Sequence, residues 1–86
     1  MTEKISEKLH IERRRRKETL KMVCSVIGCS TIYLSDVETG KKLPLDGKML
    51  YNLAIHYGID FENLIRTAYN QKCEEIIQKY KGVNRD

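Results

Sequence analysis

Residues 23–44 read VCSVIGCSTIYLSDVETGKKLP, and this stretch predicts two short helices joined by a tight turn. An apolar stripe at helical spacing leads up to Gly28 and consists of Leu20, Val23, Cys24 and Ile27. Gly28 can adopt a positive φ without steric cost, which suits the end of a helix and a sharp change of direction. The first of the two helices is therefore expected to end at this glycine.

The second helix of the pair is marked by a cap, an apolar face and a stop. Ser30 or Thr31 can cap its start by accepting a hydrogen bond from a backbone N–H group. Its buried face is expected to consist of Tyr33, Leu34 and Val37. Gly40 should end the helix, and Pro44 follows where continuing it would be costly.

These residues resemble the phage-repressor and Cro-like helix-turn-helix family, of the xenobiotic-response-element type. Cys24 stands where the family usually has alanine at the helix crossing, and Gly28 stands at the turn. The family's E-x-G-K-x-x-P ending is matched by Glu38, Gly40, Lys41, Lys42 and Pro44. Downstream, the family's fourth and fifth helices are matched by Leu50, Leu53, Ala54, Tyr57, Gly58, Ile59, Phe61 and Leu64, so that the resemblance covers roughly residues 4–66.

The resemblance implies a compact, all-α, five-helix lambda-repressor-like DNA-binding domain in residues 1–66. The helical spacing of apolar residues beyond it predicts an extended C-terminal helix in residues 67–86. The resemblance also implies double-stranded DNA as the partner and a sequence-specific transcriptional regulator, expected to be a repressor that acts as a dimer. The alternative is a helix-turn-helix scaffold used mainly for protein interaction, as an antagonist or co-regulator. No cofactor, metal ion or small-molecule ligand is implied. We expect no enzymatic activity, because no nucleophile, acid–base pair or phosphate loop is recognisable.

The exposed side of the second helix is expected to contact the bases. The positions that match the family's base-facing residues are Ser30, Thr31, Ile32, Ser35 and Asp36. Hydroxyls can donate or accept, Ile32 can contact a thymine methyl, and Asp36 can accept from cytosine N4. The candidates for phosphate contacts are Lys21, Thr39, Lys41, Lys42, Arg14 and Arg16. Leu20 stands where the family often has a backbone-anchoring glutamine, so Lys21 is the expected substitute.

The run from Arg13 to Lys17 cannot face one DNA backbone as a whole, because consecutive helical residues point about 100° apart. The resemblance implies that Arg13 pairs with Glu38 and braces the first helix against the third. For Arg14 and Arg16 the alternative to phosphate contact is a solvated helix end whose aliphatic stems cover apolar surface.

The flanking sequence predicts two further helices of the domain. Ile5 and Leu9 begin the apolar stripe of a first helix from about Glu3 to Lys17. A fourth helix, capped by Asp46, should run to Tyr57 and stop at Gly58.

A fifth helix, capped by Asp60, should continue to about Lys81, which is longer than the compact fold requires, before a frayed tail over residues 82–86. It has two readings: its apolar side folds back over the domain, or it packs against a second subunit. The second reading is favoured, and the residues expected at that contact are Tyr69, Cys73, Ile76 and Tyr80. A dimer would set two recognition helices about one DNA turn, roughly 34 Å, apart.

Length and composition indicate one small domain. The chain has 86 residues, and a domain of that size is only marginally stable alone, so dimerisation would help it. Ten of the 16 basic residues but only six of the 12 acidic ones lie in residues 1–42, so the positive surplus falls in the half with the helix-turn-helix, where it can neutralise phosphates. We expect a cytoplasmic location, because no signal peptide or apolar run of about 18 residues is visible.

The cysteines and histidines are not expected to bind a metal. Cys24, Cys29 and Cys73 are an odd number at spacings typical of no zinc site, and His10 and His56 are isolated. Reduced thiols are expected, with Cys24 as a small core residue; a redox-sensing role is the alternative.

Overall fold

The computed structural model describes residues 4–84, and within that range it contains five helices and no strand. The helices are α1 (Ile5–Arg15), α2 (Leu20–Ile27), α3 (Thr31–Thr39), α4 (Gly47–Tyr57) and α5 (Phe61–Asn84). The predicted all-α class and the expected five helices are confirmed.

One core joins the helices into a compact body. α1 packs against α3 and α5, α2 packs against α3 and α4, and α4 packs against the first part of α5. The largest fully buried side chains are Ile5, Leu9, Val23, Leu34, Val37, Pro44, Leu50, Leu53 and Leu64. The apolar stripes that predicted helices in the sequence are therefore the surfaces that meet in this core.

The helix ends follow the predicted turn chemistry at most positions. Gly28 and Gly40 have φ values of 85° and 86°, in the left-handed region that other residues avoid. Ser30 caps α3 by accepting from the N–H of Tyr33 at 3.0 Å, and Asp46 accepts from Lys48 N–H at 3.0 Å. The Asp60 carboxylate likewise accepts from the N–H of Asn63 at 2.9 Å, in the first turn of α5.

The two ends of the chain differ from expectation. α1 ends at Arg15 instead of Lys17, because Lys17 adopts a positive φ of 57°, a conformation that helices do not continue. The expected start at Glu3 lies outside the described residues, and α1 begins at Ile5 after an extended Lys4. α5 runs to Asn84, three residues past the expected end, since a single glycine at position 82 weakens a helix without ending it. Residues 85 and 86 of the expected frayed tail lie outside the described range.

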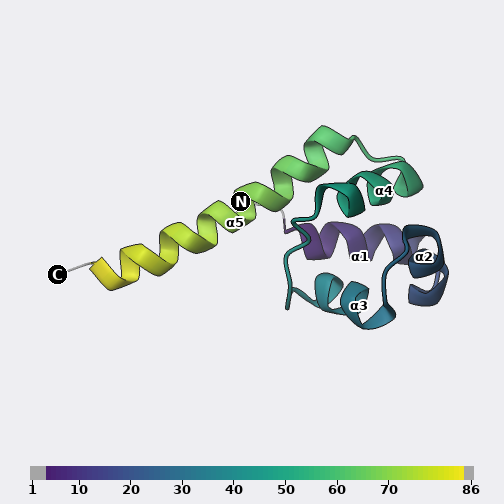
Figure 1. Cartoon of the computed structure of the whole chain (residues 1–86), viewed down its shortest axis with the longest axis horizontal. Coiled ribbons are helices and arrows are strands. Elements are labelled where there is room, and N and C mark those ends of the chain that lie inside the picture. The colour runs from purple at the N-terminus through teal and green to yellow at the C-terminus, as the bar shows by residue number, and fades with distance from the viewer. Residues whose placement is uncertain (1–3, 85–86) are drawn as a thin grey trace.

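α5 leaves the compact body part-way along its length (Figure 1). Ala68 is the last buried one among the side chains of α5 that the structure describes, and every described side chain from Lys72 to Lys81 is exposed. The molecule is accordingly elongated, with extents of 49 × 25 × 22 Å. The expected division after residue 66 thus falls inside the packed part of α5, and the reading in which the helix folds back over the domain is wrong for residues 72–81.

Among the described helices, none is by itself long and apolar enough to cross a membrane. α2 and α3 reach the length and composition of a span only when they are joined, and the chain bends by 111° between them.

Candidate nucleic-acid interface

α2 and α3 form a unit in which two short helices meet at a steep angle. The bend between them is 111°, and the turn that joins them is Gly28, Cys29 and Ser30. A steep crossing of two helices joined by a three- or four-residue turn with glycine is the geometry of helix-turn-helix units. Leu34 and Val37 of α3 are fully buried against the body, so the opposite side of α3 faces outward.

The expected base-facing residues lie on the outward side of α3 and at its N-terminus. Ser30, Thr31 and Ile32 are exposed, and Ile32 is the most open of the exposed large apolar residues, at 74%. Ser35 and Asp36 are half-buried one turn further along. The surface is thus formed by hydroxyls, one aliphatic side chain and one carboxylate, in one continuous strip.

α3 is braced against α1 by an ion pair that the resemblance implied. Arg13 Nε donates to Glu38 Oε2 at 2.9 Å and Arg13 Nη2 donates to Glu38 Oε1 at 2.9 Å. The Glu38 carboxylate also contacts His10 Nδ1 at 2.9 Å, and the Glu38 side chain is only 3% exposed. The hydrogen bonds between Arg13 and Glu38 raise the pKa of Arg13 above its ordinary value. The pair fixes the C-terminal half of α3, so the role of Arg13 is structural.

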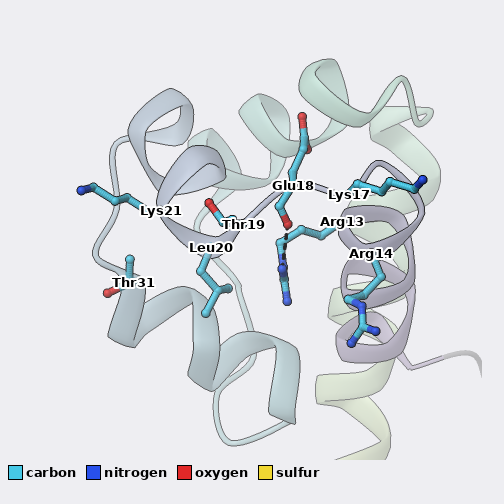
Figure 2. A pocket seen from close by; sticks show the side chains of 8 residues that line it. All are labelled: Arg13, Arg14, Lys17, Glu18, Thr19, Leu20, Lys21 and Thr31. Atoms are coloured by element: carbon cyan, nitrogen blue, oxygen red, sulfur yellow. Dashed lines mark hydrogen bonds between the residues drawn. The ribbon is translucent and has the colours of Figure 1, made fainter.

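Basic residues from α1 and α2 surround a shallow hollow beside the start of α3. The hollow, of about 830 Å³, is lined by Arg13, Arg14, Lys17, Glu18, Thr19, Leu20, Lys21 and Thr31. Figure 2 shows Lys21 and Thr31 on one side and Arg14 and Lys17 on the α1 side. Two of the expected phosphate contacts therefore line the same hollow as the expected base contact Thr31: Lys21 lies on the side of Thr31, and Arg14 lies across from it.

Thr19 and Lys17 are among the residues at this hollow that were not predicted from the sequence as site residues. Thr19 caps α2 by accepting from the N–H of Met22 at 3.1 Å, which places the N-terminus of α2 at the hollow. Lys17 joins the basic residues there because its left-handed backbone turns the chain from α1 into α2. The threonine could have been found from its place before the apolar stripe, whereas nothing in the sequence marks the positive φ of a lysine.

The far end of α3 carries the other group of expected phosphate contacts. Lys41 and Lys42 are exposed just beyond Gly40. Lys42 Nζ lies 4.0 Å from Asp36 Oδ2 and 5.5 Å from the centre of the Tyr33 ring. The hydroxyl of Thr39 donates to the backbone oxygen of Ser35 at 2.9 Å. The charge of Asp36 is thus partly balanced by a neighbouring lysine, which reduces its repulsion of a phosphate.

Arg16 does not join the expected phosphate contacts. Its Nη2 donates to the backbone oxygen of Tyr57 at 2.8 Å, and its guanidinium lies over the ring of the same tyrosine, 5.6 Å from the centre. These contacts hold the side chain at the C-terminal end of α4, where an orphan carbonyl needs a donor. Arg16 therefore ties α1 to α4.

The four residues expected at a dimer contact lie on one side of α5 and form what we call the α5 stripe: Tyr69, Cys73, Ile76 and Tyr80. All four are exposed, Ile76 at 45% and Tyr80 at 55%. Tyr69 is also tied to the body, since its hydroxyl donates to the backbone oxygen of Leu45 at 2.6 Å. The stripe thus begins where α5 leaves the body and continues along its projecting part.

Within residues 4–84, no three His, Cys, Asp or Glu side chains are grouped so that they could hold a metal ion. Comparison with known proteins adds no relative: no family model matches the chain, and no curated protein matches it.

Proposed function

We propose that this protein is a sequence-specific, double-stranded DNA-binding regulator with a lambda-repressor-like fold, and that it acts as a dimeric repressor by occupying its operator. One observation carries the proposal. α3 crosses α2 at a steep angle with its outer side open, and basic side chains lie near both of its ends. That combination suits a helix that enters the major groove while its flanks contact the two phosphate backbones.

The dimensions and chemistry of α3 fit this role. Its nine residues form a helix about 13 Å long, and the major groove, about 12 Å wide, admits one α-helix. Thr31 and Ser35 can donate to or accept from base edges, and Ile32 can cover a thymine methyl. No arginine, asparagine or glutamine stands on this strip for bidentate purine contacts, so affinity depends strongly on the phosphates.

Two groups of side chains are proposed to hold the phosphates. Arg14, Lys17 and Lys21 surround the hollow at the start of α2, and the N-terminus of that helix adds the positive end of its dipole. Lys41 and Lys42 stand at the other end of α3. Each phosphate that is neutralised releases counterions, so binding should weaken steeply with salt.

A second copy is proposed to pack on the α5 stripe. Its residues are spaced four, three and four apart, which is the spacing of a two-helix seam. Two copies joined in this way can present two α3 helices to half-sites about 34 Å apart on one face of the duplex. The apolar side chains of the stripe, exposed in one chain, would then be covered.

The test is selection of random duplexes at two salt concentrations with the full chain. A consensus with two-fold symmetry is expected, with affinity falling steeply with salt. Lys41→Ala should weaken all sequences alike and reduce the salt slope by about one, whereas Thr31→Ala should change the preference at particular positions. Lys81→Ala is the matched control, because it removes one charge from the exposed end of α5 and should leave binding unchanged.

A protein-interaction scaffold is the second candidate, and exposed apolar side chains favour it. Met22, Val26 and Ile32 are 53%, 63% and 74% exposed on α2 and α3. Under this candidate no duplex consensus emerges, and Ile32→Ala weakens binding to a protein partner while Lys41→Ala does not. A consensus that depends on Thr31 contradicts it.

A further inference from the structure

Two thiols lie in contact in the turn between α2 and α3. Cys29 Sγ donates to Cys24 Sγ across 3.5 Å, and Cys24 Sγ donates in turn to the backbone oxygen of Ser30 at 3.3 Å. The backbones of the two cysteines are also linked, since the N–H of Cys29 donates to the oxygen of Cys24 at 3.3 Å. Both thiols are free, as is that of Cys73 on the projecting part of α5.

The two sulfurs have different surroundings. Cys24 is 6% exposed in the core, and its burial and its contact with Cys29 raise the pKa of its thiol to about 11. Cys29 is half-buried and lines a cleft of about 290 Å³ together with Lys48 and Asp46. A reagent can therefore reach Cys29 from the cleft, whereas Cys24 is held in its protonated form behind it.

We propose that Cys24 and Cys29 form a reversible modification site, a dithiol that a small disulfide such as oxidised glutathione converts into an intramolecular disulfide. A disulfide bond is about 2.05 Å long, so the sulfurs must approach by about 1.5 Å. The space beside the intervening Gly28 is open to such a movement, because no atom beyond its chain neighbours and its own helix lies within 4 Å of the position where its Cβ would be. The backbone link already holds the two residues close together.

The reaction proceeds by two exchanges. The thiolate of Cys29 attacks one sulfur of oxidised glutathione, a mixed disulfide forms and one glutathione thiolate leaves. Cys24 then gives its proton to solvent and attacks Cys29 Sγ, so that the second glutathione leaves as a thiolate. The two cysteines together lose two electrons and two protons, and the glutathione disulfide is reduced to two glutathione molecules. The high pKa of Cys24 makes the second exchange the slow one.

Closing the bond changes the start of α3. The thiol proton that Cys24 donates to the Ser30 oxygen is lost, and Cys29 is drawn toward α2. Ser30 is the N-cap of α3 and Thr31 its first residue, so both shift. This consequence rests on the proposed function: oxidation should lower affinity for the selected duplex about tenfold, as the loss of one good base contact does. A thiol reductant should restore it.

The test uses the full chain with Cys73→Ser, so that two cysteines remain. After incubation with oxidised glutathione the folded protein should lose two hydrogens in mass and both free thiols, with one peptide cross-link between Cys24 and Cys29. In Cys24→Ala, tested in the same Cys73→Ser background, Cys29 should instead keep one glutathione adduct. In Cys29→Ser in that background the buried Cys24 should remain a free thiol.

Two results would overturn the proposal: a glutathione adduct that persists on Cys29 while Cys24 is present, or a protein that keeps both thiols. Mass spectrometry detects the disulfide between Cys24 and Cys29 without any DNA. If the reduced chain binds no duplex, that result therefore contradicts the proposed function and leaves the dithiol proposal standing. A disulfide that forms without changing duplex affinity would overturn the regulatory consequence.

Discussion

Residues 4–71 and residues 72–84 belong to one chain, and they are held in place by different forces. The compact body buries its apolar side chains among four helices and the first part of α5. Elements far apart in sequence are also joined there, by the ion pair of Arg13 with Glu38 and by the hydrogen bond from Arg16 to the Tyr57 oxygen. The α5 extension, residues 72–84, has only exposed side chains over its described part, residues 72–81. It is held by its own backbone hydrogen bonds and by its continuity with the anchored turns. The same substitution should therefore change the free energy of unfolding by different amounts in the two regions.

The largest difference is expected between two glutamate–arginine pairs. Glu38→Ala should lower the free energy of unfolding by about 3–5 kcal/mol, because it leaves the nearly buried Arg13 guanidinium without its counter-charge. Glu62→Ala removes a pair with Arg66 in which both side chains are 70% exposed, and it should leave the free energy of unfolding nearly unchanged. Urea unfolding of both variants measures the contrast, and equal costs would contradict it.

Apolar truncation should separate the two regions next. Leu34→Ala should cost about 2–5 kcal/mol, since its side chain is fully buried and a cavity remains. Ile76→Ala, at a position 45% exposed, should cost less than about 0.5 kcal/mol when unfolding is followed at low protein concentration. A large cost for Ile76→Ala under those conditions would mean that the extension packs within its own chain.

Alkaline pH should distinguish a cysteine of the body from one of the extension. The folded pKa of Cys24 is raised to about 11, above the value of about 8.5 in an unfolded chain. The folded state holds this proton more tightly, so the stabilisation is full below about pH 8.5 and is lost as the pH rises to 11. Burial raises the pKa of Tyr57 as well, with the same sign at higher pH.

Stability in urea, with reductant present, should accordingly fall by about 2 kcal/mol between pH 8.5 and pH 10.5. Cys24→Ala should flatten this decline, and Cys73→Ser on the exposed extension should leave it unchanged. A profile that does not fall over this range would argue against a buried, protonated Cys24.

The smallest predicted effect locates the border between the regions. Gln71 Oε1 accepts from the backbone N–H of Ile5 at 3.0 Å, where α5 leaves the body. Gln71→Ala should cost about 1 kcal/mol and expose the first amide of α1 to exchange. Gln78→Ala, two turns further along and exposed, is the matched control and should change neither stability nor that amide. If Gln78→Ala lowers stability as much as Gln71→Ala does, the part of α5 that packs on the body extends beyond residue 71 toward the C-terminus.

Much of the body could be predicted from the sequence because local rules determine its elements. The positive φ of Gly28 and Gly40 and the caps by Ser30 and Asp46 follow from residue type and from the spacing of apolar residues. The pairing of Arg13 with Glu38 was implied by the resemblance alone.

The remaining features depend on contacts between distant parts of the chain. Arg16 reaches the oxygen of Tyr57 across 41 residues, and no periodicity in the sequence indicates this contact. The hollow beside α3 depends on the left-handed backbone of Lys17, which a lysine rarely adopts. The apolar spacing of α5 predicted a helix with one apolar side, but a spacing does not state whether that side packs on its own chain or stays open.

The exposed extension also affects how such a molecule can diversify. Because no described side chain between Lys72 and Lys81 supports the core, substitutions there leave the folding of the body nearly untouched. Under the proposed function, the surface that selects a partner and the surface that selects a duplex can then be altered one at a time. Under the same proposal, an exchange of residues 72–84 between proteins of this architecture would change which chains form a dimer, while α3 and its outward side stay unchanged.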